Sequence, residues 1–404
     1  MWKIVGFITS SDFMKIVYVG MIRRSSARGV IKKVISKIQF LSTYYDIDGL
    51  LLFDELRDLP SGIPINIRCE QTKGNSFIAI QNLVDIESYD LVIMRYPGAS
   101  KGLLRFLKTF PKKVIFEHNS IEEKEKLFYL KSFSIKDYLY QLTHWKWTII
   151  KGWIQLYHEK KIGSKCLALA KGGIGVTNEI ASYERSRCKN YEIQVIANGI
   201  DVSKVPLREI PVFVSTSPLI LFFSSGSAND WHGIDRLLNG IYNYQGNREI
   251  KLYIVGLYLN ENQKLIDQIN ASRNKSIECL GLIESSQAFQ LSSHCHLGIG
   301  SLGLHRIPLS EACTLKVREY CAMSLPFVLS HTDVDTAKNE KFKSFFYQIP
   351  ANESAVDIEE MIDFTEKVYN QKDVRILREL CEKYMSVEVK MKEMARLLSD
   401  YAKK

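Results

Sequence analysis

The chain has 404 residues, 46% of them hydrophobic and 25% charged, which indicates a globular protein of two or three domains with ample core. No apolar run reaches about 18 residues, so we expect no membrane-spanning helix. Apolar patches near the N-terminus are interrupted by Lys3, Asp12 and Lys15, and no signal peptide is predicted. The eight cysteines form no Cys-x2-Cys pair, which argues against zinc and disulfides and favours a reducing cytoplasm.

The net charge of +9 is concentrated in the first part of the chain. Residues 1–165 hold 26 Lys and Arg side chains against 16 Asp and Glu side chains. Such an excess favours an anionic partner. The sequence has no helix-turn-helix, zinc-finger or ribonucleoprotein motif, so nucleic acid is not the predicted partner. An anionic membrane face or a phosphate-bearing lipid acceptor fits the charge better.

Short apolar runs alternate with helical patterns in the first half of the chain. We predict strands at 15–19, 50–53, 91–94, 114–117, 173–177 and 193–196, and helices at 28–44, 100–109, 122–160 and 178–188. This alternation is typical of a parallel, doubly wound sheet, which binds ligands at the carboxyl ends of its strands. Gly29, Arg95 and His118 follow strand ends, so we expect them to converge on one edge.

A proline-containing linker at 206–218 precedes a second alternating set. Its strands are predicted at 219–223, 251–255, 277–280, 297–300, 326–329 and 345–349. Its helices are predicted at 232–244, 261–272, 285–294, 312–323, 355–369 and 372–384, followed by an amphipathic helix at 386–402. The two halves therefore repeat one α/β architecture.

The stretch 124–165 mixes aromatic side chains with lysines. Trp145, Trp147 and Trp153 lie among eight lysines between Lys124 and Lys161. Basic residues mixed with aromatic ones can place a helix at an anionic membrane surface. The alternative is an ordinary pair of helices that bury their aromatic residues against the sheet.

Two glutamates, Glu311 and Glu319, stand eight residues apart beside a predicted helix at 314–323. An unpaired buried carboxylate is costly, so acids near an apolar helix indicate a function. At about 1.5 Å per residue their spacing is about 12 Å, roughly the separation of a sugar ring and a ribose in a nucleotide-sugar. A helix N-terminus between them suits a phosphate. The alternative is two solvated surface charges.

Six segments occur in an order shared by one enzyme family: 14–20, 28–30, 117–119, Asn198-Gly199-Ile200-Asp201, Trp231-His232-Gly233-Ile234-Asp235 and the Glu311-x7-Glu319 stretch. Together they resemble the retaining glycosyltransferases of the bacterial family 4 type, from about residue 14 to the C-terminus. The resemblance implies the GT-B fold, in which two Rossmann-like domains face each other across a cleft. It implies an acceptor-side domain of residues 1–205 with a crossover helix at 386–404, and a nucleotide-sugar-binding domain of residues 206–385.

The same resemblance assigns roles residue by residue. The donor would be held without a metal or other cofactor by Gly29, Gly226, Ser227, His232, Thr314, Leu315, Lys316 and Glu319. Within this set, Glu319 would bond the ribose hydroxyls and Lys316 would supply a cation, unless Lys316 is a surface lysine. The predicted catalytic residues are Glu311, which would orient the donor sugar, and His118, which would lie near the acceptor. For His118 the alternative is a satisfied core or capping histidine.

The sequence departs from the family pattern where a phosphate clamp is expected. The family usually has Arg or Lys at the position of Ser227 and Lys at the position of His232. A diphosphate would raise the pKa of His232, which could then be protonated. Arg236 could compensate, or it could be a solvated helix residue.

Two segments lie outside these motifs. Asp333-Val334-Asp335 has the spacing of metal-dependent transferases, but that motif belongs to a different fold, and we predict a loop and no metal site. Residues 1–13 precede the usual family start and are predicted to be dispensable.

We therefore expect a retaining hexosyltransferase of capsule, lipopolysaccharide or related polysaccharide biosynthesis. It would transfer a hexose from a nucleoside-diphosphate sugar to a lipid-linked or growing saccharide. The expected location is cytoplasmic, peripheral on the inner membrane face through 124–165. The alternatives are a sugar-nucleotide 2-epimerase of the same fold, a catalytically weak sugar-nucleotide-binding protein, and a nucleic-acid binder.

Overall fold

The computed structural model describes residues 14–24, 28–55, 62–72, 76–144 and 147–403, so the prediction for residues 1–13 lies outside the described residues. The chain divides into two compact units. The first unit takes residues up to 176 together with 180–196 and 391–404, and the second takes 177–179 and 197–390. Residues 197–205 and 386–390 thus group with the second unit.

The first unit is built on a seven-stranded sheet in which every pairing is parallel. In spatial order its strands are β3 (Ile67–Gln71), β2 (Asp46–Glu55), β1 (Lys15–Arg24), β4 (Leu91–Arg95), β5 (Val114–His118), β6 (Gly172–Gly175) and β7 (Ile193–Val195). All the strands predicted for this half of the chain are present, and β3 was not predicted. Its sequence, Ile67-Arg68-Cys69-Glu70-Gln71, is largely polar because β3 is an edge strand.

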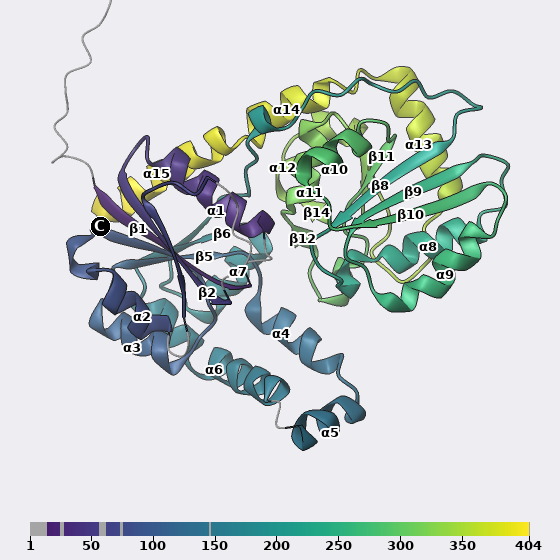
Figure 1. Ribbon diagram of the computed structural model, residues 1–404. Coiled ribbons are helices and arrows are strands. Elements are labelled where there is room, and N and C mark those ends of the chain that lie inside the picture. Colours follow the sequence, from purple (N-terminus) through teal and green to yellow (C-terminus); the bar gives the residue numbers. More distant parts are fainter. Residues whose placement is uncertain (1–13, 25–27, 56–61, 73–75, 145–146, 404) are drawn as a thin grey trace, which may run out of the picture. The chain divides into compact units, whose positions relative to one another are not determined.

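Helices lie on both faces of this sheet (Figure 1). The helices of the first unit are α1 (Arg28–Leu41), α2 (Ser76–Leu83), α3 (Lys101–Thr109), α4 (Glu122–Lys131), α5 (Ile135–Thr143), α6 (Thr148–Leu169), most of α7 (Asn178–Arg187) and the last part of α15 (Val387–Lys403). One face packs Val17 and Val19 against Phe77, Leu103 and Cys166. The end of α15 is attached to the same sheet, because the Tyr401 hydroxyl donates a 2.9 Å hydrogen bond to the Glu192 carbonyl.

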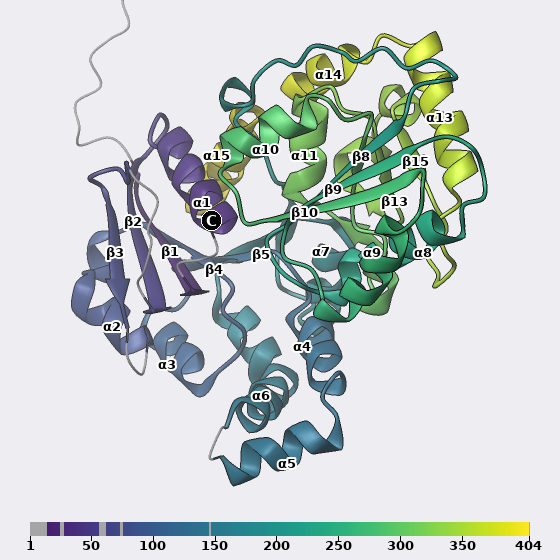
Figure 2. The same cartoon turned by 45° about the vertical axis from the view of Figure 1, so that its right-hand side comes forward.

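Helices α4, α5 and α6 form an arm that extends away from the sheet, with α5 at its far end (Figures 1 and 2). The arm has a small core of its own, made by Leu130, Ile149 and Leu156. A capping box between Ser134 and Asp137 starts α5 and separates it from α4. The single helical stretch predicted at 122–160 is therefore three helices.

The second unit has a six-stranded sheet, again parallel throughout. Its spatial order is β10 (Lys275–Gly281), β9 (Ile250–Gly256), β8 (Leu219–Ser225), β11 (Leu297–Ile299), β13 (Phe327–Leu329) and β15 (Phe346–Gln348). A small separate sheet pairs β12 (Glu311–Ala312) with β14 (Thr332–Asp333). The helices are α8 (Ile234–Asn243), α9 (Gln263–Asn270), α10 (Ser285–Ser292), α11 (Leu315–Ala322), α12 (Val334–Ala337), α13 (Ile358–Gln371) and α14 (Ile376–Tyr384).

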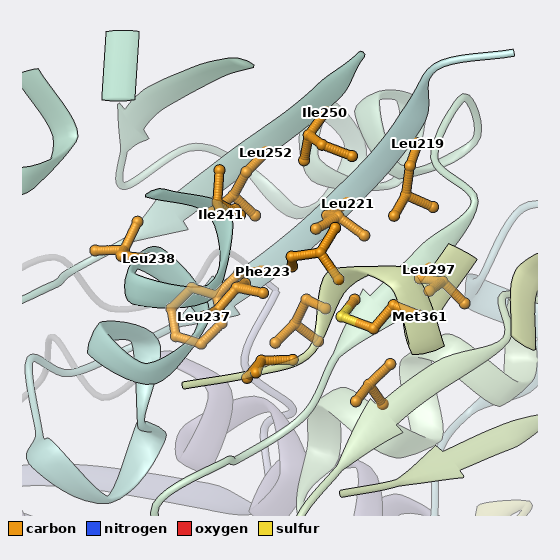
Figure 3. Packing of buried hydrophobic residues seen from close by; sticks show 14 of the residues in the cluster. Leu219, Leu221, Phe223, Leu237, Leu238, Ile241, Ile250, Leu252, Leu297 and Met361 are labelled. Carbon is orange, nitrogen blue, oxygen red and sulfur yellow. The ribbon is translucent and has the colours of Figure 1, made fainter. Parts of the chain in front are cut away.

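Apolar side chains from β8, β9 and α8 meet in the core of the second unit, together with Met361 of α13 (Figure 3). Leu221, Phe223 and Leu237 are 1% exposed or less. Two parallel sheets with flanking helices confirm the predicted α/β class.

Candidate functional site

Unsatisfied polar groups gather where α11 begins. Thr314 precedes the helix without capping it through its side chain, and its buried Oγ1 has no hydrogen-bond partner in residues 14–24, 28–55, 62–72, 76–144 and 147–403. Lys316, in the first turn, is 8% exposed, and within the described part of the chain its Nζ has no hydrogen-bond partner either. The ammonium lies 4.5 Å from the centroid of the Phe223 ring, at the end of β8. The first N–H groups of a helix lack intrahelical acceptors, so this is a place with several donors and few acceptors.

His232 approaches the same phenyl ring from another element. It ends a short 3-10 helix (Asp230–His232) before α8, and its ring stands edge-on to Phe223 with centroids 6.1 Å apart. Its Nδ1 is buried and finds no hydrogen-bond partner in the described residues, while its Nε2 lies 3.4 Å from the Ser227 hydroxyl. Gly233 follows at a positive φ of 65°, and a Cβ there would meet the backbone N of Gly303 at 2.6 Å. Glycine is therefore required at this turn. The turn places His232 beside Lys316.

Burial dominates the electrostatics of this cluster. It lowers the pKa of Lys316 to about 7, although the nearby Glu319 carboxylate opposes the shift. Burial, and then the charge of Lys316, lower the pKa of His232 to about 2. The imidazole is therefore neutral in the structure as it stands. A bound anion would favour the charged form of both groups.

The Asn198-Gly199 motif holds the turn that leads into α11. The Asn198 side chain donates a 2.6 Å hydrogen bond to the Cys313 carbonyl, and the Asn198 N–H lies 2.9 Å from the Cys313 sulfur. A Cβ on Gly199 would meet the Cα of Val387 at 2.7 Å. The motif thus fixes the start of the helix that carries Lys316.

Asp333 and Asp335 belong to a buried ion network. Arg318, fully buried on α11, donates to both carboxylates, and its contact with Asp335 is 2.7 Å. The Lys390 ammonium donates to the other oxygen of Asp335 at 2.7 Å. The spacing that resembles a metal motif is therefore explained by three salt bridges, two from Arg318 and one from Lys390. Sequence reasoning missed Arg318, because an arginine between apolar residues of a helix gives no sign of its partners.

Glu311 does not lie on the helix. It belongs to strand β12, and its Oε2 accepts a 2.9 Å hydrogen bond from the Glu179 N–H. The Glu179 carboxylate in turn accepts from the N–H groups of Ser310 and Glu311, at 2.8 and 3.0 Å. The helical rise used to estimate the spacing of Glu311 and Glu319 was therefore wrong for this segment. Both glutamates are half-buried.

The other predicted donor-binding residues lie at strand and helix ends. Gly226 follows β8, and a Cβ there would meet nothing within 4 Å. The Ser227 hydroxyl accepts a 2.7 Å hydrogen bond from the Asn229 amide, and Leu315 is half-buried as the first residue of α11. Gly29, in the first unit, is exposed near the start of α1.

Arg236 is neither a free cation nor a solvated side chain, contrary to both alternatives considered for it. It is 2% exposed and donates to backbone carbonyls, including Ser354 at 2.8 Å and Pro350 at 3.0 Å. Its role is to hold loops of the second unit together. Lys316 is thus the candidate cation in the described part of this cluster.

In the first unit, His118 is 1% exposed and sits among aromatic side chains. Its Nε2 lies 3.0 Å from the Tyr191 hydroxyl, and its ring centroid is 4.6 Å from that of Tyr96. Burial lowers its pKa to about 3, so it is neutral. Among the described residues the His118 Nδ1 is buried without a hydrogen-bond partner, so His118 is not a fully satisfied core histidine, and its catalytic role stays a prediction.

The residue before it, Glu117, forms a network that sequence reasoning missed. Its carboxylate accepts hydrogen bonds from Lys37 at 2.5 Å, from the Tyr18 hydroxyl at 3.0 Å and from Asn119 at 3.0 Å, and Lys33 lies 3.4 Å away. Lys33 and Lys37 are one turn apart on α1 and read as surface lysines in the sequence. Their spacing places both ammonium groups on one face of α1, but it does not identify Glu117 as their partner.

No protein-family model and no curated protein sequence matches this chain. Solved structures do match. Sucrose-phosphate synthase from Thermosynechococcus elongatus is similar at a TM-score of 0.65 and 12% identity, over 96% of this chain and 98% of that chain. HepE from Anabaena, in complex with UDP and glucose, gives 0.60 and 14% over 96% and 100%.

WaaG, a glycosyltransferase involved in lipopolysaccharide biosynthesis, gives a TM-score of 0.59 and 12% identity over 95% of this chain and 99% of that chain. At this identity the likeness shows the fold. The described helices include none that is long and apolar enough to cross a bilayer. The structural matches show that the chain has the GT-B fold of known glycosyltransferases.

Proposed function

We propose that the protein is a retaining glycosyltransferase whose second unit binds a nucleoside-diphosphate sugar at the start of α11. The observation that carries this proposal is the buried ammonium of Lys316, which has no hydrogen-bond partner among the residues that the structure describes. The fold supports it, because similar folds belong to glycosyltransferases and the Anabaena HepE structure holds UDP and glucose.

A diphosphate suits the α11 cluster because it supplies what the cluster lacks. An isolated ammonium is costly to bury, and a contact with a phenyl ring offsets only part of that cost. A phosphate would accept hydrogen bonds from Lys316, the Thr314 hydroxyl and the first N–H groups of α11. His232 would complete the clamp as a neutral donor or, beside the anion, as a cation. Lys316 and His232 would together perform the role of the Arg and Lys that the family resemblance leads us to expect.

In the reaction we propose, the bond between C1 of the hexose and the β-phosphate oxygen breaks. The acceptor hydroxyl oxygen bonds to C1 on the same face, and its proton passes to the departing diphosphate. Negative charge develops on the diphosphate, so donors fixed around it lower the barrier. Glu319 would bond the ribose hydroxyls and Glu311 would orient the donor sugar. No metal or other cofactor is proposed.

We place the acceptor at an anionic membrane surface, on the cytoplasmic side, reached through the arm. Large apolar side chains are exposed on it, with Ile135 at 80%, Tyr157 at 59% and Leu139 at 56%. Between 129 and 158 the sequence has four lysines and one acid, Asp137. Core packing, the alternative considered for this stretch, therefore does not account for the exposed apolar side chains of the arm. Exposed apolar groups beside lysines match an anionic bilayer.

Vesicle co-sedimentation tests the membrane contact. At low salt the protein should pellet with phosphatidylglycerol vesicles and not with phosphatidylcholine vesicles. A double variant, Ile135→Ser with Leu139→Ser, should stay in the supernatant. Ile65→Ser, which changes a fully exposed isoleucine outside the arm, should pellet like the wild type. Equal pelleting of the arm variant would overturn this part of the proposal.

Donor turnover tests the proposed reaction. The protein is incubated with UDP-, GDP- and ADP-sugars, beginning with UDP-glucose, and release of nucleotide and sugar is followed by chromatography. We expect slow hydrolysis of one donor, with release of the sugar in the anomeric form that it had in the donor. Release of a 2-epimer would indicate the epimerase. Binding of a donor without turnover would indicate a catalytically weak binding protein, and binding of no donor would indicate a protein of another kind.

A further inference from the structure

A hollow in the second unit lies away from the α11 cluster. Its volume is about 500 Å³, within the range of small-molecule sites. One wall is the end of α8 with the turn into β9, residues 242–247, and the other is the turn from α9 into β10. The hollow therefore lies where the parallel strands begin, whereas Gly226 and Ser227 follow the end of β8. Because β9 has 7 residues, the two edges are about 23 Å apart, and the hollow is no part of the proposed donor site.

Hydrogen bonds join the two walls of this hollow. The Asn274 amide donates to the Gly246 carbonyl at 3.0 Å, and the Lys275 ammonium donates to the Tyr242 carbonyl at 2.9 Å. A Cβ on Gly246 would lie 2.3 Å from the Tyr244 hydroxyl, so the turn packs closely on that side chain. The walls are thus held together, and the hollow is a formed feature of the unit.

The lining is rich in amide groups beside an aromatic ring. Asn243, Gln245 and Asn247 are exposed, and Asn274 lies on the facing wall. An amide both donates and accepts hydrogen bonds, and so does a sugar hydroxyl. The ring of Tyr242 is 45% exposed, and the C–H face of a pyranose packs on such a ring. The lining therefore matches a saccharide in both of its parts.

The same lining disfavours other classes of ligand. The described residues that form it include no acid, so it offers no carboxylate to a cation. Its cation, Lys275, already donates to a backbone carbonyl and lies 5.9 Å from the centroid of the Tyr244 ring. A phosphate or carboxylate would therefore lack a counter-charge of its own. An apolar ligand would find the two tyrosine rings among polar groups.

We propose that this hollow binds a neutral oligosaccharide, with Tyr242 against one sugar ring and Asn243 and Asn247 bonded to the hydroxyls. Resting on the proposed function, the occupant is a segment of the glycan that the enzyme extends, bound away from its reacting end. A second attachment raises the effective concentration of a long glycan at the enzyme. The hollow would thus keep the enzyme on a long glycan between transfers.

Saturation-transfer NMR on the full chain tests this site. The probes are maltohexaose, mannohexaose and chitohexaose, with a hyaluronan hexasaccharide as the anionic probe. We expect transfer to at least one neutral hexasaccharide and several-fold less to hyaluronan. Tyr242→Ser should weaken the transfer several-fold, whereas Tyr44→Ser, which removes a 41% exposed tyrosine of the first unit, should leave it unchanged. Transfer that is absent from the wild type, equal for hyaluronan or unchanged in Tyr242→Ser overturns the proposal.

Two small residues in the turn after α9 supply a second matched pair. Ser272 lines the hollow and the exposed Ala271 does not, so Ser272→Trp should abolish the transfer and Ala271→Trp should leave it unchanged. Equal transfer in these two variants would also overturn the proposal. UDP binding is measured on every protein and should be unchanged in the variants. A wild type that binds UDP and no hexasaccharide counts against the hollow alone, whereas one that binds a hexasaccharide and no UDP counts against the donor site.

Discussion

Glu117, near the end of strand β5 in the first unit, and Lys316, in the first turn of helix α11 in the second unit, are both buried charged side chains, yet their surroundings are opposite. Two lysines, a tyrosine and an asparagine surround Glu117. Although burial opposes the shift, Lys37 and Lys33 hold the pKa of Glu117 well below its usual range. The Lys316 ammonium lies over the Phe223 ring, none of the described residues forms a hydrogen bond with it, and burial lowers its pKa.

The two side chains thus differ in the source of their counter-charge. The partners of Glu117 lie within the protein, whereas we expect a ligand to supply the partner of Lys316. A buried charge that has partners is compensated within the protein. Removing one partner destabilises the fold, because the remaining charges are then buried without compensation. A buried charge without partners lowers the stability of the empty protein, which is tolerable where a ligand supplies the counter-charge. We therefore expect the removal of Glu117 to destabilise the protein and the removal of the Lys316 charge to stabilise it.

The largest expected effect is on Glu117. Glu117→Ala leaves Lys33 and Lys37 buried beside each other, so the free energy of unfolding should fall by about 3–5 kcal/mol in urea denaturation. Glu70→Ala removes an exposed partner of Arg68 and should change it by about 0.5 kcal/mol or less. A loss near that of Glu70→Ala would show that the Glu117 network contributes little.

Substitutions of the two motif glutamates test the donor site by kinetics. We expect Glu319→Ala to raise the donor KM about tenfold, a loss of roughly 1.4 kcal/mol of binding. Glu311→Ala should lower kcat more than it changes KM. Because Glu311 also accepts from the Glu179 N–H, urea denaturation must show that the variant is folded. Wild-type kinetics in both variants would contradict the roles proposed.

The pH dependence of donor binding follows from the lowered pKa of Lys316. With a pKa of about 7, the free amine loses its proton above pH 7, whereas the diphosphate favours the ammonium. UDP affinity should therefore fall as the pH rises above 7, by up to about tenfold per pH unit. Calorimetry in two buffers of different ionisation enthalpy should show proton uptake at pH 8. Affinity that is flat from pH 6 to 9 would contradict this.

The smallest effect is on stability. Lys316→Met keeps the length of the side chain and removes its charge, so we expect the free energy of unfolding to rise by about 1 kcal/mol at pH 6. A lysine whose pKa is lowered by folding destabilises most below that pKa, and the penalty fades as pH rises towards the unfolded value. The gain should therefore shrink by pH 9. A destabilised Lys316→Met at pH 6 would show that the ammonium has partners in solution.

Most of the fold could be predicted because buried parallel strands are continuous apolar runs, as in β4 and β5. The polar edge strand β3 and the short strands β12 and β14 lacked that signal. The position of α11 was predictable from its apolar pattern and its stop at Leu325-Pro326. The partners of Glu117, Arg318 and Arg236 could not be predicted, because each salt bridge or carbonyl contact joins segments that only the fold brings together.

Calorimetric titration of UDP into the wild type, Lys316→Met and Lys341→Met tests the central claim most directly. Lys341 is an exposed lysine of the same unit and serves as the control. We predict that Lys316→Met weakens UDP binding by about 10- to 100-fold, the range expected for losing a charge-assisted hydrogen bond in a buried place, and that Lys341→Met binds like the wild type. Equal affinity in all three proteins would contradict the claim that the buried ammonium at the start of α11 binds the diphosphate.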